Sequence, residues 1–192
     1  MEKNKVNSRQ KILETASELF KSQGYHATGL NQIIKESGAP KGSIYHYFPG
    51  GKEELAIESI KLAVRKGKEN LINDLSKSSD PLKSIEELLK KISDDFDPHN
   101  PHQGVSISML AMETSVISDP LRNACLDAFK TWESIFYDKL IEGGFNPEEA
   151  EGLGMTIHFL LEGAVALSIV RQDNKPFLII SKQIKKLLSC NT

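Results

Sequence analysis

Residues that begin and end helices recur along the whole chain, and no stretch between them alternates apolar and polar residues as a half-buried β-strand does. Four capping side chains are each followed within two residues by a proline that fits the first turn of a helix: Asp80, Ser118, Asn146 and Asn174. Because these signals divide the chain into helical segments only, we expect an all-α fold with nine helices.

The same signals place the helix boundaries. The first helix has one apolar face and is expected to end at Gly24, and the second is expected to end at Gly38. The remaining helices are expected over about 41–48, 52–75, 81–96, 104–116, from the Ser118 cap to near Gly143, 147–171, and from the Asn174 cap to about Ser189.

The second and third helices are short and lie close together in sequence. The second contains Leu30, Ile33 and Ile34, and the third stops before Pro49 because the residue preceding a proline disfavours the helical conformation. Two helices of this length joined by a tight glycine-containing turn form a helix-turn-helix pattern, here over about 29–48.

The third helix divides its side chains between packing and recognition. Ile44 and Phe48 lie four residues apart and are expected to pack on apolar residues of the first two helices. Those residues are Ile12, Phe20 and Ile33. The side chains that point elsewhere are Lys41, Ser43, Tyr45 and His46, and none of them is acidic. In the major groove a lysine donates to guanine, a serine bonds either base, and an aromatic edge contacts the thymine methyl group.

The charge of the chain is distributed unevenly. Residues 1–52 hold eight basic and four acidic side chains, a net charge of +4, whereas the whole chain has a formal net charge of −2. The rest of the chain therefore carries −6. A basic segment attached to an acidic body indicates that only the segment meets a polyanion.

Three N-terminal segments resemble a known DNA-binding domain: GYHATGL from Gly24, IIKESGAPKGSIYHYF from Ile33 and GKEEL from Gly51. They are similar to the DNA-binding domain of the TetR family of bacterial transcriptional repressors, over about residues 8–60. LAMETS from Leu110, DPLR from Asp119, Trp132 and Glu162–Gly163 extend the resemblance to the LmrA/YxaF-type subgroup.

This resemblance implies a homodimer with a DNA-binding head (residues 1–52) and a ligand-binding and dimerisation domain over 53–192. The expected function is that of a ligand-released repressor on a near-palindromic operator. The residues that match the family's DNA contacts are Thr28, Lys41, Gly42, Ser43, Tyr45, His46, Tyr47 and Lys52. The subgroup resemblance further implies a planar aromatic or drug-like effector.

The last two helices are the expected dimer face. The helix around 153–170 is apolar nearly all round and must be covered on two sides, and the final helix carries one apolar stripe. Two such helices from each subunit would form a four-helix bundle. The residues expected at this interface are Leu161, Val165, Ile169, Phe177, Ile180, Ile184 and Leu187.

A ligand pocket is expected in the body, between the long fourth helix and the helices that follow. Aromatic residues and methionine suit a pocket that adapts to flat apolar molecules. The expected lining residues are Phe96, Met109, Met112, Glu113, Phe129, Trp132, Phe136, His158, Phe159 and Glu162. A ligand that moves the fourth helix, which starts at Lys52, would also move the DNA-binding head.

Two other classes of function remain to be compared. The chain lacks the short motifs of hydrolases, phosphate-binding loops and zinc proteases, so we expect no enzyme activity and no cofactor. The acidic and histidine residues of 94–102 do not have the spacing of a metal site, and we interpret them as a solvated loop. A helical carrier of small molecules is the second alternative, and it would not need Lys41 or Tyr45.

The cellular setting follows from what the sequence lacks. We see no signal peptide and no apolar run that approaches the length of a membrane span, since Glu162, Gly163 and Ser168 interrupt the longest apolar stretch. Cys125 and Cys190 are isolated from each other, which fits a reducing compartment. We therefore expect a cytoplasmic protein with DNA and a small molecule as partners and no membrane contact.

Overall fold

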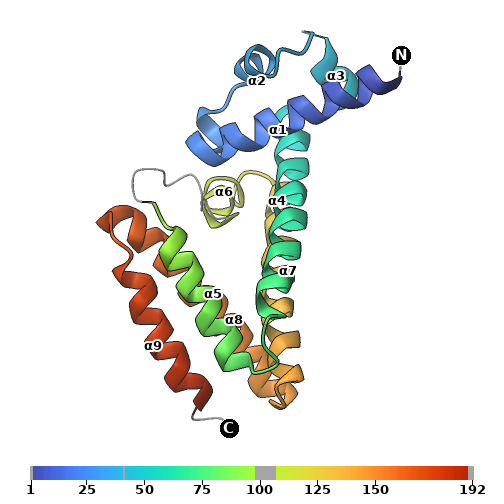
Figure 1. The fold of residues 1–192 in the computed structure, drawn as a ribbon. Coiled ribbons are helices and arrows are strands. Elements are labelled where there is room, and N and C mark those ends of the chain that lie inside the picture. Colours follow the sequence, from blue (N-terminus) through green and yellow to red (C-terminus); the bar gives the residue numbers. More distant parts are fainter. Residues whose placement is uncertain (1, 41, 98–106, 190–192) are drawn as a thin grey trace. The chain divides into compact units, whose positions relative to one another are not determined.

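A computed structural model of the chain describes residues 2–40, 42–97 and 107–189, with side chains from residue 8 onward. Over these residues it contains nine α-helices and no strand, which confirms the expected all-α fold (Figure 1). The helices are α1 (Glu2–Ala27), α2 (Leu30–Ser37), α3 (Ser43–Tyr47), α4 (Gly51–Leu75), α5 (Pro81–Asp95), α6 (Ile107–Thr114), α7 (Asp119–Glu142), α8 (Pro147–Arg171) and α9 (Lys175–Ser189).

Three of the four predicted caps hold as hydrogen bonds. A side-chain oxygen of Asp80 accepts from the Leu82 N–H at 2.9 Å, Ser118 Oγ accepts from the Leu121 N–H at 3.2 Å, and Asn146 Oδ1 accepts from the Glu149 N–H at 3.0 Å. The fourth differs, because the Asn174 amide donates to the Ser93 carbonyl at 3.3 Å. Asp173 provides a side-chain acceptor at the start of α9 instead, for the Lys175 N–H at 3.1 Å.

The glycines and the short helix refine the predicted boundaries. Gly24 interrupts α1 with φ 83° and ψ 176°, and one further helical turn follows it, so the regular first helix ends where the sequence predicts. Gly38 ends α2 in the left-handed conformation, as expected. The third helix is shorter than predicted and starts at Ser43, and the predicted start at Lys41 lies outside the described residues.

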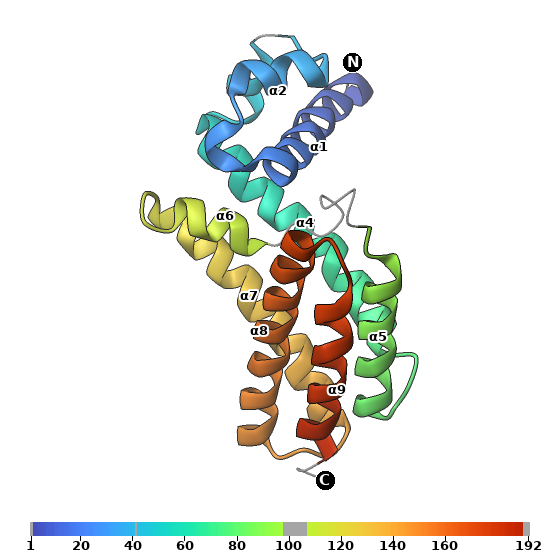
Figure 2. The ribbon, with the colours of Figure 1, turned by 90° about the vertical axis from the view of Figure 1, so that its left-hand side faces the viewer.

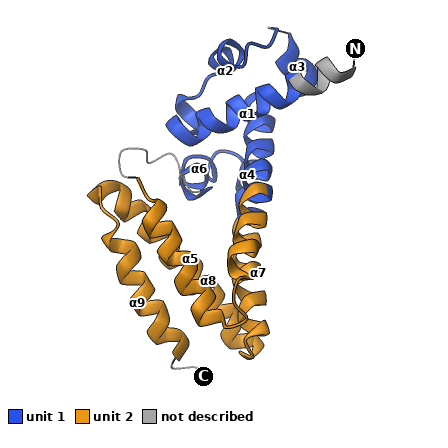
Figure 3. Ribbon diagram, in the orientation of Figure 1, with its two compact units in different colours: residues 1–65, 105–128 blue, residues 66–104, 129–192 orange. Residues whose placement is uncertain are grey.

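The chain divides into two compact units (Figure 3). Unit 1 comprises residues 1–65 and 105–128, and unit 2 comprises residues 66–104 and 129–192. The helices α4 and α7 each begin in unit 1 and end in unit 2. The boundary expected after Lys52 separates the residues that contact DNA from the rest, whereas these units are defined by packing. The expected boundary therefore stays a prediction.

Unit 1 is built around one apolar core, in which α1 packs against α2, α3 and α6. Five residues that the sequence analysis assigns to a common core belong to it and are almost fully buried: Ile12, Phe20, Ile33, Ile44 and Phe48. Leu110 of α6 and Leu121 of α7 are buried in the same core. The two short helices are therefore held by burial of their apolar side chains on α1.

Unit 2 has its own core. In the two views of Figures 1 and 2, α5 and α8 lie beside α9, in agreement with the helix contacts. Its largest fully buried side chains are Ile85, Leu89, Phe136, Leu140, Ile157, Phe177 and Ile184. Because α5 and α8 both pack on α9, the apolar stripe of α9 is used within the unit.

One sequence expectation is corrected by α8. By length and composition this helix is apolar enough to cross a membrane, since Glu162, Gly163 and Ser168 do not lower its average hydropathy sufficiently. Only 28% of its most apolar 18-residue window is buried inside the chain, so much of the helix presents apolar side chains to its surroundings. A face of this kind needs a cover.

Candidate nucleic-acid interface and ligand region

The surface of α3 separates packing side chains from exposed ones. Ile44 is buried in the unit 1 core, whereas the Tyr45 side chain is 62% exposed and His46 is exposed as well. His46 meets the Tyr47 ring edge-on, with 4.8 Å between centroids. Ser43 is half-buried at the start of the helix. This arrangement gives α3 an outward face of hydroxyl, phenol and imidazole groups.

The backbone before α3 is also accessible. Gly42 is exposed, and a Cβ added to it would meet no other atom within 4 Å. A glycine there leaves room for another molecule to approach the main chain. Lys41, which the sequence analysis places beside it, lies outside the described residues.

The two residues expected to flank α3 with phosphate contacts have different surroundings. Thr28 is fully buried, and its hydroxyl donates to the Gly24 carbonyl at 2.7 Å. The Lys52 ammonium lies 4.3 Å from the centroid of the Tyr25 ring, a cation–π contact. Loss of hydration lowers the pKa of Lys52, and the negative charge of Glu113 opposes this effect. Lys52 is therefore half-buried beside the Tyr25 ring, whereas the Thr28 hydroxyl is fully buried and bonded to the main chain.

Unit 1 also contains long-range contacts that no local pattern in the sequence predicts. The Arg9 guanidinium lies 5.0 Å from the Phe48 ring centroid and 3.4 Å from the Glu58 carboxylate. Ser118 donates to Glu53 at 2.8 Å. These contacts join α1 to α3 and α4, and the start of α7 to α4, but their partners are far apart in sequence.

Four predicted pocket residues of unit 2 gather around one imidazole: Phe129, Phe159 and Glu162 all lie beside His158. The Phe129 ring meets the buried His158 imidazole at 5.4 Å between centroids, and Phe159 is tilted against the same imidazole at 6.4 Å. His158 Nε2 lies 3.6 Å from Glu162, and Nδ1 lies 3.5 Å from Glu133, a residue that the sequence analysis does not include. Neither imidazole nitrogen has a hydrogen-bond partner within the described residues.

The other predicted pocket residues are scattered. In unit 2, Phe96 packs on Phe177 at 5.5 Å, Phe136 is buried in the core, and Trp132 lies against Gly67. The remaining three belong to α6 in unit 1. Met109 and Met112 are exposed there, and the Glu113 carboxylate accepts hydrogen bonds from α1.

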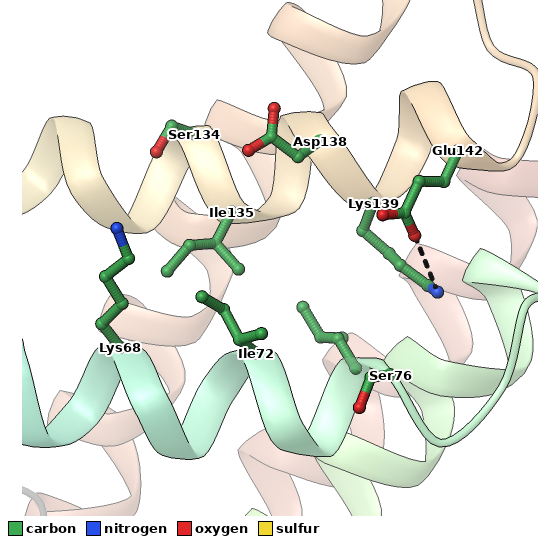
Figure 4. Close-up of a pocket in the computed structure, with 9 residues that line it drawn as sticks. Lys68, Ile72, Ser76, Ser134, Ile135, Asp138, Lys139 and Glu142 are labelled. Atoms are coloured by element: carbon green, nitrogen blue, oxygen red, sulfur yellow. Dashed lines mark hydrogen bonds and ion pairs between the residues drawn. The ribbon is translucent and has the colours of Figure 1, made fainter.

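Two grooves lie among the described residues of unit 2, and the sequence does not predict them. One, of about 210 Å³, lies between α4 and α7, where Ile72 and Ile135 face each other between Lys68 and the Lys139–Glu142 ion pair (Figure 4). The other, of about 550 Å³, lies between α7 and α8 and includes Glu133. Only the second has the size usual for a ligand site. None of the ten predicted pocket residues lines either groove.

The expected dimer residues also occupy two environments. Phe177, Ile180 and Ile184 are buried in the unit 2 core, because α5 and α8 cover that side of α9. Leu161, Val165 and Ile169 are half-buried, and Leu187 is exposed. The exposed apolar residues of α8 are Met155, Phe159, Leu167 and Val170, and those of α9 are Leu178, Ile179 and Leu187.

The described residues contain no group of three histidine, cysteine or acidic side chains placed to hold a metal ion. Two histidines of the loop considered in the sequence analysis, His99 and His102, lie outside those residues. Cys125 is buried in unit 1, and burial raises the pKa of its thiol to about 11.

Comparison with known proteins identifies both parts of the chain. Residues 12–58 match the family described as bacterial regulatory proteins, tetR family. Residues 81–183 match the C-terminal domain described as transcriptional regulator LmrA/YxaF-like. The HTH-type transcriptional regulator YxaF of Bacillus subtilis (strain 168) is 49% identical over 182 residues, which cover 95% of each chain. The HTH-type transcriptional regulator LmrA of the same organism is 42% identical, over 95% of this chain and 97% of LmrA.

Solved structures agree with the fold. A TetR-family regulator from Cytophaga hutchinsonii superimposes with a TM-score of 0.85 at 20% identity, over 98% of this chain and 96% of the other. The relatives are DNA-binding transcriptional regulators and not enzymes, as expected from the sequence. This chain belongs to the TetR family of bacterial transcriptional regulators, with an LmrA/YxaF-like C-terminal domain.

Proposed function

We propose that the protein is a ligand-released repressor that binds a near-palindromic operator as a homodimer. The observation that carries this proposal is the division of α3, with Ile44 in the core and Tyr45 and His46 outside. An exposed helix face of this composition, with an accessible glycine at its start, suits insertion into a major groove. We assign base contacts to Lys41, Ser43 and Tyr45, and backbone contacts to Gly42, His46, Tyr47 and Lys52.

Thr28 has a different part in this proposal. Its hydroxyl is buried on Gly24, so it fixes the turn before α2 and does not reach a phosphate. The backbone contacts then fix the register of α3 on the duplex, and the base contacts supply the sequence preference.

The exposed apolar face of α8 supports the homodimer. Met155, Phe159, Leu167 and Val170 lie on it, and a Cβ added to Gly163 on the same face would meet nothing within 4 Å. A second copy of α8 would bury this face and approach closely at the glycine. Leu178, Ile179 and Leu187 of α9 would add to the same interface. This cover suits a cytoplasmic regulator, in which α8 meets protein rather than lipid.

We place the effector near His158, between α7 and α8. The imidazole is buried without a hydrogen-bond partner, two carboxylates lie close to it, and Phe129 provides an aromatic wall. A planar aromatic or drug-like molecule with a polar group would gain both stacking and a hydrogen bond there. A ligand bound here would displace α7, which begins in unit 1.

Selection of bound duplexes from a random DNA pool by the purified chain tests the function. We expect an enriched near-palindrome whose half-sites lie about one helical turn apart, or a multiple of it. The selected DNA is then used to screen for aromatic compounds that release the protein. Failure to enrich any sequence would overturn operator binding, whereas enrichment without a releasing compound would overturn only the ligand control.

A further inference from the structure

The end of α1 is bonded to a helix that lies far away in the sequence. The Gly24 kink leaves the N–H groups of the following turn without the acceptors that a continuous helix provides. Glu113 of α6 supplies the acceptor: its Oε2 accepts from the Tyr25 N–H at 2.7 Å and from the His26 N–H at 3.0 Å. His26 Nε2 also lies 3.3 Å from the Glu113 carbonyl oxygen.

This contact depends on the residue at position 24. The backbone of Gly24 has a positive φ, and a Cβ built on it would collide with the Glu113 carboxylate. Any side chain there would therefore displace the Glu113 carboxylate from its place beside the turn, and it would strain the turn itself. The position of the Glu113 carboxylate thus requires a glycine at position 24, although Glu113 lies 88 residues after Tyr25 in the sequence.

The turn held by Glu113 leads directly into the DNA-binding elements. The Tyr25 ring stacks on Phe20 at 5.8 Å between centroids and carries the Lys52 ammonium on one face at 4.3 Å. The Gly24 carbonyl accepts from the Thr28 hydroxyl, immediately before α2. A change at Glu113 would therefore reach both the start of α2 and Lys52.

The head has a single covalent link to the rest of the chain, through α4. Glu113 provides a second, non-covalent attachment of the head, to α6. The Ser118–Glu53 hydrogen bond joins the first turn of α4, directly after the head, to the start of α7. Within unit 1 the head is therefore attached at two points, through the start of α4 and through Glu113 of α6. A head held at two points keeps one orientation, whereas a head held at one point can swing.

From these contacts we propose that Glu113 is a positioning residue for operator binding, which holds the head in the orientation that matches the two half-sites. This inference rests on the proposed function and adds to it the residue that holds the end of α1 on α6, through the hydrogen bonds to Tyr25 and His26. The carboxylate itself touches no DNA.

The test compares three variants of the full chain. Glu113→Ala removes the acceptor, and Glu113→Gln keeps an oxygen that accepts both N–H groups, as Oε2 does alone in the wild type. Val116→Ala is the matched control, because Val116 lies three residues after Glu113 and is 89% exposed. Hydrogen–deuterium exchange of residues 24–28 and affinity for the selected operator are measured for each, with operators whose half-sites are moved by one or two base pairs.

We expect Glu113→Ala to speed exchange at 24–28, weaken operator binding about tenfold and flatten the preference for half-site spacing. Glu113→Gln should restore all three properties nearly to the wild-type values, and Val116→Ala should change none. If Glu113→Ala lowers only the unfolding temperature, and the folded protein keeps its affinity and spacing preference, the positioning role is overturned. If the wild-type chain itself binds no selected DNA, the proposed function fails instead.

Discussion

Trp132 of α7 occupies the space that a side chain at Gly67 of α4 would need: a Cβ at position 67 would lie 2.5 Å from Cη2 of the indole. Glycine inside a helix is disfavoured by about 1 kcal/mol relative to alanine. Its presence in the middle of α4 is explained by this approach of the two helices. The contact lies within unit 2, where α4 and α7 also border the groove of Figure 4.

The first prediction concerns this pair. Gly67→Ala should lower the free energy of unfolding by about 1–2 kcal/mol in the wild-type background, because the indole must move. In a Trp132→Leu background the same substitution should stabilise the protein by up to about 1 kcal/mol, because only the gain in helix propensity remains. Urea unfolding followed by circular dichroism measures both effects. Equal effects in the two backgrounds would show that the indole does not limit position 67.

The second prediction concerns the dependence of stability on pH. The Asp74 carboxylate accepts from Lys77 at 2.6 Å and from Lys91 at 2.7 Å. Burial tends to raise the pKa of Asp74, but the two ammonium groups outweigh it and hold the pKa below its ordinary value of 3.8. A carboxyl with a lowered pKa stabilises the folded state above its unfolded pKa, and this contribution is lost as the pH falls through the folded value.

Asp74→Asn should therefore lower the free energy of unfolding at pH 7 by about 1–2 kcal/mol. The difference from the wild type should shrink as the pH falls below about 4 and on through the lowered folded pKa of Asp74, where the carboxyl is protonated in both states. Glu69→Gln, at an exposed position of α4, is the control and should follow the wild-type curve. A constant difference between Asp74→Asn and wild type down to pH 2 would show that ionisation of Asp74 does not stabilise the fold.

The third prediction concerns the homodimer. Val170 of α8 is 81% exposed in the single chain, so Val170→Glu should leave the subunit folded and place a charge in the interface. Light scattering after size exclusion should then report a monomer where the wild type is a dimer. Val116→Glu is the matched control, since Val116 is 89% exposed in unit 1, outside the proposed interface. If the Val170→Glu variant is still a dimer, this face of α8 is not part of the dimer interface.

Local signals in the sequence were sufficient for much of the fold. The caps at Asp80, Ser118 and Asn146 act on N–H groups within three residues, so the sequence alone predicts them. The sequence also shows the apolar stripe of α9, but it does not show which helices cover that stripe. A stripe with Phe177 and Ile184 looks the same whether it meets a partner or its own subunit, and the packing of α5 and α8 decides that here.

The candidate site was predictable where its residues lie on one short helix. Tyr45 and His46 follow from the spacing of α3, and His158 and Glu162 from the spacing of α8. The sequence places Glu113 only among the expected pocket residues. Its hydrogen bonds to Tyr25 and His26 follow from the packing of α6 on α1, a long-range contact that no local pattern encodes.

The central claim is that the outward face of α3 reads DNA, and operator affinity of Tyr45→Ala across a series of salt concentrations tests it most directly. Tyr45 is 62% exposed, so the variant should keep its fold. We predict that it binds the selected operator about 5- to 150-fold more weakly than wild type, while Lys83→Ala on α5 binds normally. Both Tyr45→Ala and wild type should show the same steep fall of log K with log salt, about −0.9 per phosphate contact. Equal affinity of Tyr45→Ala and wild type, or a flat response to salt, would contradict the claim.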